Sequence, residues 1–419
     1  MVQRMNLPNG LRLVYEPMEH VRSLSIGIWI YTGSRDEKVE ENGITHFLEH
    51  MLFKGTKKRS ATEIAESFDR IGGYVNAFTA KEYTCFYAKV MDKHGKEAVE
   101  ILSDMFFHSI FDEEEMAKER NVVLEEIRMV EDTADDVVHD DLDAAAYGNH
   151  PLGRPILGTE KTVATFGREQ LHDFLHTHYR PDNVVISMAG KIDDGLLSFV
   201  ESKFSGLSAK EAPPNHETPP VLFNNKEARA KRIEQAHLCL GFNGVPIHGD
   251  DIYAMVLFDQ LLGGSMSSRL FQEIREQRGL AYAVFSDHLA YRDGGMLTVY
   301  AGTAPAHVDE VLGAVLSIME RFANEEVDRK DLENVKSQVQ GSMVLGLEST
   351  SSRMSRNGKN ELSLGEHPSL DAVTERIDAV TTKEIQEVAK KLYENDCALS
   401  IISPDGKLPK GRSKLSSMA

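Results

Sequence analysis

The sequence is poor in cysteine and has no long apolar run. Its 419 residues include three cysteines, Cys85, Cys239 and Cys397, which are far apart and form no Cys-x-x-Cys pair. A disulfide framework is therefore excluded, and reduced thiols in the core are expected. No stretch of about 18 apolar residues occurs, which excludes a transmembrane helix. The N-terminal residues also lack the apolar segment of a secretory signal, so we expect a cytoplasmic location and no membrane partner.

Basic residues are outnumbered by acidic ones. The chain has 47 lysines and arginines against 66 aspartates and glutamates, a formal charge of −19. Non-specific binding to nucleic acid needs a positive surface, so no nucleic-acid partner is expected. If the negative charge lines a cleft, it favours basic or neutral partners. The hydrophobic fraction of 41% and the charged fraction of 27% are ordinary for a soluble globular protein.

Proline marks the clearest boundary in the chain. The segment 207–225, LSAKEAPPNHETPPVLFNN, holds four of the 14 prolines and has almost no apolar periodicity. The chain length fits two or three domains of about 100–200 residues each. We therefore expect one domain over residues 1–207, a linker over 208–225, and a second domain over 226–419.

The two halves resemble each other in order and pattern. Residues 144–163 and 361–380 share a Gly-x-His-Pro element followed by a charged turn, and 168–190 matches 382–406 as a helix followed by an apolar strand. A repeat of about 200 residues indicates a duplicated domain. Strands and helices come in groups, so we expect an α+β fold. Each of the two homologous domains should be a mainly antiparallel sheet packed with helices.

Three local patterns help to place the chemistry. Residues 60–71 predict a helix that opens with a Ser60–Glu63 capping box. Residues 74–90 are rich in aromatic and β-branched side chains, which predicts two strands joined by a turn at 81–82. Residues 112–130 predict a long helix.

The strongest chemical signal is the stretch from Gly43 to His50, GITHFLEH. His46 and His50 are four residues apart, and helical side chains at this spacing lie on one face. Glu49 borders the same face. The pattern His-x-x-Glu-His reverses the His-Glu-x-x-His order of many metalloproteases, and two imidazoles suit Zn²⁺. A carboxylate beside the ion can act as a general base.

A catalytic zinc site needs a third protein ligand. Glu119 and Glu126 are seven residues apart in the predicted helix 112–130, so they share a face. Glu125 is a rival to Glu126. A solvated acidic helix face is the alternative interpretation of all three glutamates.

These motifs resemble those of a known family. GITHFLEHMLFKGT followed by ERNVVLEEI resembles the inverzincins of the pitrilysin family of metallopeptidases, and by length the mitochondrial-processing-peptidase-like subgroup with its short bacterial members. The resemblance covers the whole chain, including the duplication. It implies that His46, His50 and Glu126 bind zinc and that Glu49 is the general base. It also implies that Glu119 supports the site from outside the ligand set.

The resemblance assigns further residues. Within SSRLFQEIREQRGLAYAV, it implies that Arg275 and Tyr282 of the second domain contribute to the active site. Asn76, Ala77 and Phe78 are the candidates for an exposed edge strand to which the substrate adds as an extra strand. In the second half the corresponding stretch, LFDQLLGG, lacks both histidines. One zinc site per chain is therefore expected.

The function implied is a zinc-dependent endopeptidase. It would cleave short or unfolded peptides, in extended form and basic in character, inside a closed chamber. Larger relatives close four such domains around a chamber, so a two-domain chain is expected to form a homodimer, with Arg275 and Tyr282 acting in trans. Two alternatives stay open. One is a non-catalytic or partner-dependent subunit of a processing-peptidase-like complex, and the other is a module that binds zinc without turnover.

Overall fold

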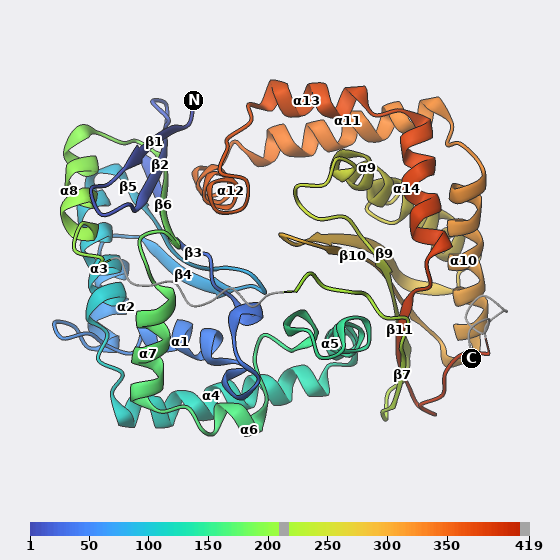
Figure 1. Cartoon of the computed structure of the whole chain (residues 1–419), viewed down its shortest axis with the longest axis horizontal. Helices are drawn as coiled ribbons and strands as arrows, with labels where there is room; N and C mark the ends of the chain where they lie inside the picture. The colour runs from blue at the N-terminus through green and yellow to red at the C-terminus, as the bar shows by residue number, and fades with distance from the viewer. Residues whose placement is uncertain (209–217, 411–419) are drawn as a thin grey trace. The chain divides into compact units, whose positions relative to one another are not determined.

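Two compact units make up the chain. The computed structural model describes residues 1–208 and 218–410 (Figure 1). The first unit comprises Met1–Arg128, the described residues of 155–217, and Leu345–His367. The second comprises Met129–Arg154, Thr218–Val344 and the described residues from Pro368 onward. Each unit is built on a single β-sheet.

The sheet of the first unit has six strands. In spatial order they are β1 (Gln3–Asn6), β2 (Arg12–Pro17), β6 (Val184–Gly190), β3 (Ser23–Ile30), β5 (Thr84–Met91) and β4 (Tyr74–Thr79). Only β2 and β6 are parallel. The helices of this unit are α1 (Ile44–Leu52), α2 (Ala61–Arg70), α3 (Gly95–His108), most of α4 (Glu113–Asp132), α6 (Glu160–Val163), α7 (Arg168–His178), α8 (Asp194–Phe204) and α12 (Thr350–Ser363).

The sheet of the second unit has five strands. In spatial order they are β7 (Lys226–Ala230), β11 (Ala398–Ser403), β8 (Ala236–Asn243), β10 (Gly295–Thr303) and β9 (Ala281–Ala290), and only β7 and β11 are parallel. Its helices are α5 (Ala134–Tyr147), α9 (Ile252–Leu262), α10 (Val308–Asn324), most of α11 (Arg329–Gly346), α13 (Leu370–Ala379) and α14 (Thr382–Glu394). A π-helical turn spans Phe271–Gln277.

The two sheets share one topology. The order β2-β6-β3-β5-β4 in the first unit recurs as β7-β11-β8-β10-β9 in the second, with the parallel pair in the same place. The edge strands β4 and β9 also correspond in chain order. Strand β4 comes after helix α1 in the first unit, and β9 comes after helix α9 in the second. The expected α+β fold of two homologous, mainly antiparallel domains is confirmed.

The two compact units do not coincide with the two parts of the chain on either side of the proposed linker. Helix α5 follows α4 in the first half of the sequence, yet it packs on β8 and β11 of the second unit. Helix α12 lies in the second half, yet it packs on β2, β3 and β6 of the first unit (Figure 1). The division into 1–207 and 226–419 therefore separates the two sheets but assigns these two helices differently. An amphipathic helix fits either of two similar sheets, so the sequence does not show the exchange.

The proposed linker 208–225 lies partly outside the described residues. From Thr218 onward it belongs to the second unit. There the amide of Phe223 donates to the carbonyl of Ala146 at 2.7 Å, and Asn225 Nδ2 donates to the carbonyl of Ala145 at 3.1 Å. Its last residues are therefore tied to α5.

Two features of the composition, the small number of cysteines and the lack of a long apolar run, can be compared with the structure. Cys85, Cys239 and Cys397 are all buried free thiols, as expected. Burial raises the pKa of each of these thiols, which makes them poor nucleophiles. Among the helices of residues 1–208 and 218–410, none is long and apolar enough to cross a bilayer.

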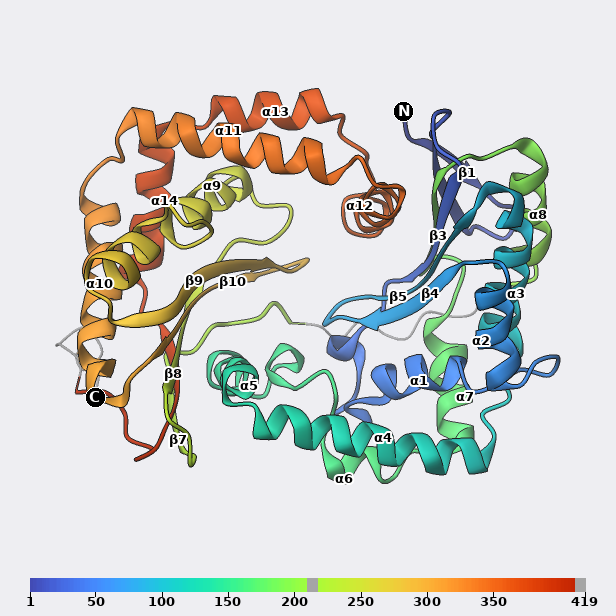
Figure 2. The same cartoon turned by 180° about the vertical axis from the view of Figure 1, so that it is seen from behind.

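Strand β3 is buried on both faces and separates two helix layers. Leu24, Ile26, Ile28 and Ile30 face the core formed with α1, α2 and α3. Figure 2 shows α2 and α3 on the side of this sheet opposite α12. The alternate residues face α12, because successive side chains of a strand point to opposite sides. On that side Trp29 Nε1 lies 3.3 Å from Met354 Sδ. A Cβ atom on Gly358 would lie 2.4 Å from Trp29 Nε1, so α12 approaches the sheet as closely as glycine allows.

This close approach predicts a large cost for a small substitution. Gly358→Ala should lower the free energy of unfolding by about 1–3 kcal/mol, because Trp29 or α12 must shift. Ser355→Ala is the matched control in the same helix and should change it by less than about 0.5 kcal/mol. Trp29 is the single tryptophan, so its fluorescence in a urea titration reports this interface. Equal midpoints for Gly358→Ala and wild type would contradict the packing argument.

Candidate metal centre

Helix α1 is fixed at its N-terminus by a carboxylate from the preceding loop. Glu37 Oε1 accepts from the amide of Thr45 at 2.9 Å, and its Oε2 accepts from the amide of Gly43 at 2.8 Å. These amides have no partner within the helix, and a negative charge is favoured there. Gly43 has a φ of 93°, and a Cβ on it would lie 2.6 Å from the carbonyl oxygen of Leu157. The chain therefore needs glycine at this entry point.

Three side chains converge beside α1. His46 and His50 lie one turn apart on this helix, and Glu126 comes from α4. His46 Nε2 lies 3.2 Å from His50 Nε2, and Glu126 Oε2 lies 3.7 Å and 3.6 Å from these two nitrogens. All three side chains are partly buried. Among the described residues this is the one group of His, Cys, Asp or Glu side chains arranged to hold a metal ion.

The spacing of the three donor atoms fits a tetrahedral ion. With bonds of about 2.0–2.1 Å, as zinc makes, two ligand atoms of a tetrahedron lie about 3.3 Å apart. The three observed separations, 3.2, 3.6 and 3.7 Å, are close to that value. Two imidazoles and one carboxylate also form a donor set typical of catalytic zinc sites, which leave a fourth position open.

A second carboxylate orients His50. Glu119 Oε1 accepts from His50 Nδ1 at 2.8 Å, which leaves the lone pair of Nε2 free toward the centre. Glu119 Oε2 also accepts from Lys54 Nζ at 2.6 Å. Only 6% of the Glu119 side chain is exposed, so both of its oxygens are used inside the protein. Glu125 points elsewhere: its side chain is 71% exposed and pairs with Arg128.

The pKa values of the two histidines shift in opposite directions, toward the neutral form for His46 and toward the protonated form for His50. Burial lowers the pKa of His46 to about 3, and the nearby His50 adds to the effect. Burial also opposes protonation of His50, but its hydrogen bond to Glu119 and the charge of Glu126 outweigh burial and raise its pKa. Burial raises the pKa of Glu49, partly offset by a hydrogen bond from Thr79. A carboxylate with a raised pKa is a stronger base.

Glu49 has one hydrogen bond to the protein. Thr79 Oγ1, at the end of β4, donates to Glu49 Oε2 at 2.6 Å. Glu49 Oε1 has no protein hydrogen-bond partner among the described residues.

Sequence reasoning missed Thr79, Lys54 and Glu37. The alternation of β4 carried a signal for Thr79, since it lies two residues after the buried Ala77 on the same face.

Strand β4 is an edge strand. It pairs with β5 alone in the described sheet, and Asn76, Ala77 and Phe78 lie in its middle. The exposed Asn76 uses its own Oδ1 to accept from the amide of Ala77 at 2.9 Å. Its Nδ2 donates to Tyr74 Oη at 2.8 Å. The Asn76 side chain thus occupies the place that a main-chain carbonyl of an added strand would take.

Arg275 and Tyr282 belong to the second unit and contact each other there. Arg275 lies in the π-helical turn, with its guanidinium 5.0 Å from the centre of the Tyr282 ring and 4.7 Å from that of Phe271. Tyr282 lies near the start of the edge strand β9 and is 76% exposed. Both residues line a cavity of about 480 Å³. The seven-residue spacing thus brings a cation and a phenol together at an open surface.

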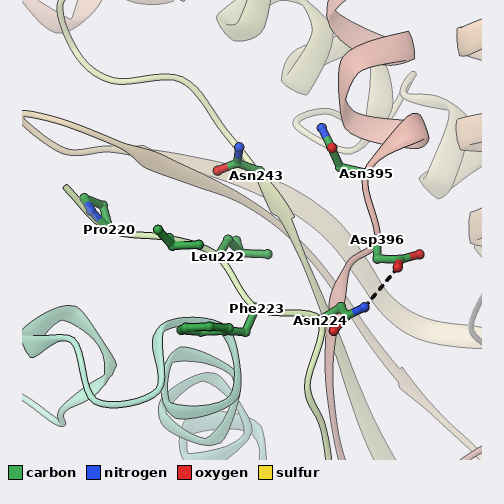
Figure 3. Close-up of a pocket in the computed structure, with 8 residues that line it drawn as sticks. Pro220, Leu222, Phe223, Asn224, Asn243, Asn395 and Asp396 are labelled. Atoms are coloured by element: carbon green, nitrogen blue, oxygen red, sulfur yellow. Dashed lines mark hydrogen bonds between the residues drawn. The ribbon is translucent and has the colours of Figure 1, made fainter. Parts of the chain in front are cut away.

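Another cavity in the second unit lacks comparable chemistry. It has a volume of about 430 Å³ (Figure 3). Its polar lining consists of amides and one carboxylate, and Asp396 already accepts from Asn224 Nδ2 at 2.9 Å.

The histidines of α7 also form no metal-binding group in the described part of the chain. His172 and His178 instead contact the rings of Phe111 and Phe174.

Two family models match the chain in succession. Residues 12–160 match the model described as Insulinase (Peptidase family M16). Residues 165–339 match the model described as Peptidase M16 inactive domain. The first match includes the three converging side chains and Glu49, and the second includes Arg275 and Tyr282.

Proteins similar over their full length are named as zinc proteases. The chain is 52% identical to the uncharacterized zinc protease YmxG of Bacillus subtilis, over 98% of this chain and 100% of that protein. It is 41% identical to a zinc protease of Streptomyces coelicolor, over 96% of this chain and 90% of that protein. A crystal structure of a protease from Helicobacter pylori has the same fold, with a TM-score of 0.91, 21% identity, and 96% and 99% of the two chains covered.

The geometry predicts which side chains are needed to hold a metal ion. After dialysis against a divalent ion, the wild type should hold one ion per chain, because the described residues contain one such group. His50→Ala and Glu126→Gln should each lose it, because they remove donors. Glu125→Gln is the matched control and should keep a full equivalent. Metal analysis of the purified variants checks this, and loss of metal from Glu125→Gln would contradict the assignment of Glu126.

Proposed function

Because the chain belongs to peptidase family M16, we propose that it is a zinc-dependent endopeptidase whose metal is held by His46, His50 and Glu126. Membership confirms the family resemblance seen in the sequence. The observation that carries the proposal is the convergence of the three donor atoms at tetrahedral spacing, with Glu49 on the same helix.

Glu49 is the general base in this proposal. Zinc bound at the site supplies a Lewis acid that polarises the scissile carbonyl and makes the attacking water more acidic. Glu49 Oε1, which has no protein partner among the described residues, accepts the proton of that water. The same carboxyl group then delivers the proton to the leaving amine. Burial, which raises the pKa of Glu49, supports the first of these transfers, the acceptance of the proton.

The peptide binds as an added strand along β4. Its main-chain carbonyl displaces the side chain of Asn76 from the amide of Ala77, and Asn76 is then free to hydrogen-bond the peptide itself. Such pairing uses main-chain groups and demands an extended substrate, but little particular sequence. Asn76, Ala77 and Phe78 are therefore the proposed substrate-binding residues.

Arg275 and Tyr282 complete the active site from the second unit. Their mutual contact and exposure support a shared role at a surface open to substrate. Arg275 holds a substrate carbonyl, and the phenol of Tyr282 donates to the oxyanion that forms on attack. Following the family resemblance, we propose that a homodimer forms and that both residues serve the metal site of the partner chain.

Substrate class and location are further parts of the proposal. The formal charge of −19 supports a preference for basic peptides. A closed chamber around the dimer would admit short or unfolded chains, and the protein would act in the cytoplasm. The second half has no metal-binding group among its described residues, which supports one site per chain.

A non-catalytic or partner-dependent subunit is the alternative. Family members that lose catalysis typically lose parts of the His-x-x-Glu-His motif. Here His46, Glu49 and His50 are all present and lie together. The complete motif favours the catalytic proposal over a non-catalytic subunit. It also favours it over a module that only binds metal, because such a module would leave Glu49 without a role.

Glu49→Gln separates catalysis from metal binding. The variant should hold a full metal equivalent but hydrolyse an unstructured basic peptide with a kcat about 10²–10⁴-fold lower, because the amide cannot accept the proton. Product formation is followed by mass spectrometry beside the wild type. If wild type and variant both hold metal and neither cleaves, the catalytic proposal fails and the partner-dependent subunit is favoured.

Mixing two inactive variants tests the trans arrangement. Glu49→Gln and Tyr282→Phe chains should each have low turnover alone, the latter by about 10²–10³-fold. After random mixing, about half of the dimers pair the two kinds of chain, and each such dimer has one intact site, giving about a quarter of wild-type turnover. Turnover no higher than the average of the separate variants would contradict action in trans.

A further inference from the structure

The carboxylate of Glu49 is held by a strand outside its own helix. Its single protein hydrogen bond comes from Thr79 Oγ1 at 2.6 Å, a length typical of a hydroxyl donating to a charged carboxylate. Glu49 is partly buried, and α1 packs against β4 (Figure 2). This bond therefore joins the helix of the metal ligands to the edge strand.

Thr79 suits this task for two reasons. It is the last residue of β4 and lies on the same face as the buried Ala77, which belongs to the core shared with α1. As a β-branched residue it has a restricted χ1, which limits the directions that its hydroxyl can take. The bond occupies Oε2 of Glu49 and leaves Oε1 to accept a proton. The carboxylate is thus fixed in rotation as well as in position.

The second unit contains a similar tether but no metal-binding group among its described residues. Ser286 Oγ, on the edge strand β9, donates to Asp259 Oδ1 of α9 at 2.5 Å. Asp259 lies three residues before the end of α9, as Glu49 does in α1. A hydroxyl from an edge strand therefore holds an acidic side chain at the same place in both units. Because Asp259 belongs to no metal-binding group of the described residues, the second unit offers an internal control for the structural value of such a bond.

We propose that Thr79 is a positioning residue for Glu49, fixing its carboxylate so that proton transfer occurs beside the peptide bound on β4. The inference rests on the proposed function, in which Glu49 is the general base. Misplacing a catalytic group by about 1 Å can cost about 10²-fold in rate. Because β4 carries both Thr79 and the proposed peptide-binding residues 76–78, the substrate and the base share one support.

Three variants test the proposal. Thr79→Val keeps the shape but removes the donor, Thr79→Ser keeps the donor, and Ser286→Ala removes the equivalent bond from the second unit. For each, kcat and KM on an unstructured basic peptide, metal content and the thermal midpoint are measured. Metal-free crystal structures of both Thr79 variants show the rotamer of Glu49.

For Thr79→Val we expect kcat to fall about 10–100-fold with little change in KM or metal content, because orientation of the base is lost. Thr79→Ser should restore kcat to within about fivefold of wild type, since the hydroxyl remains. In the crystals Glu49 should adopt several rotamers in Thr79→Val and one in Thr79→Ser. Ser286→Ala should lower the thermal midpoint as much as Thr79→Val does and leave kcat near wild type.

The outcomes separate the two proposals. If Glu49→Gln is inactive while Thr79→Val keeps wild-type kcat, the positioning role is overturned and the proposed function stands. A Thr79→Ser variant as slow as Thr79→Val, or a Ser286→Ala variant equally slow, overturns the positioning role too. If the metal-loaded wild type cleaves no peptide, the proposed function fails and the inference fails with it.

Discussion

The meeting of α1 with α4 is the constraint on which the candidate site depends. Helix α1 supplies two donor atoms at i and i+4, but the third comes from a helix that begins more than sixty residues later. Ile44, Phe47, Leu48 and Met51 bury one side of α1 in the core, which turns His46 and His50 toward α4. Met116 and Val123 anchor α4 in the same core, and the next turn of that face presents Glu126. Apolar packing thus sets the separation of the polar ligands.

Apolar packing places α1, and polar contacts then hold its N-terminus and orient its side chains. Glu37 holds its N-terminus, Glu119 orients His50, and Thr79 holds Glu49. Each contact comes from a different segment of the first unit. A ligand set assembled in this way is preorganised, because little side-chain entropy remains to be lost when an ion or a substrate binds. In the second unit the corresponding helix, α9, keeps an acidic residue and its tether but has no histidine.

The structure also bears on how far the sequence could be interpreted. The capping box of Ser60 and Glu63 is present at the start of α2, and the aromatic stretch forms β4 and β5 as expected. These features depend on neighbours in the chain, so local patterns suffice. The exchange of α5 and α12 escaped prediction, since their apolar faces suit either of two sheets with the same topology. Helix α12 is nonetheless tightly packed on its sheet, as the contact of Met354 with Trp29 shows.

By itself, the sequence determined the secondary structure around the motif, the duplication and the pairing of His46 with His50, because these follow from spacing along one chain. It left Glu119, Glu125 and Glu126 as competing acidic residues on one helix. Only the tertiary structure decided among their positions: Glu126 lies beside the histidines, Glu119 behind His50, and Glu125 at the surface. The physical reason is that the rotation of α4 about its axis is set by what it packs against, and that packing partner is distant in sequence.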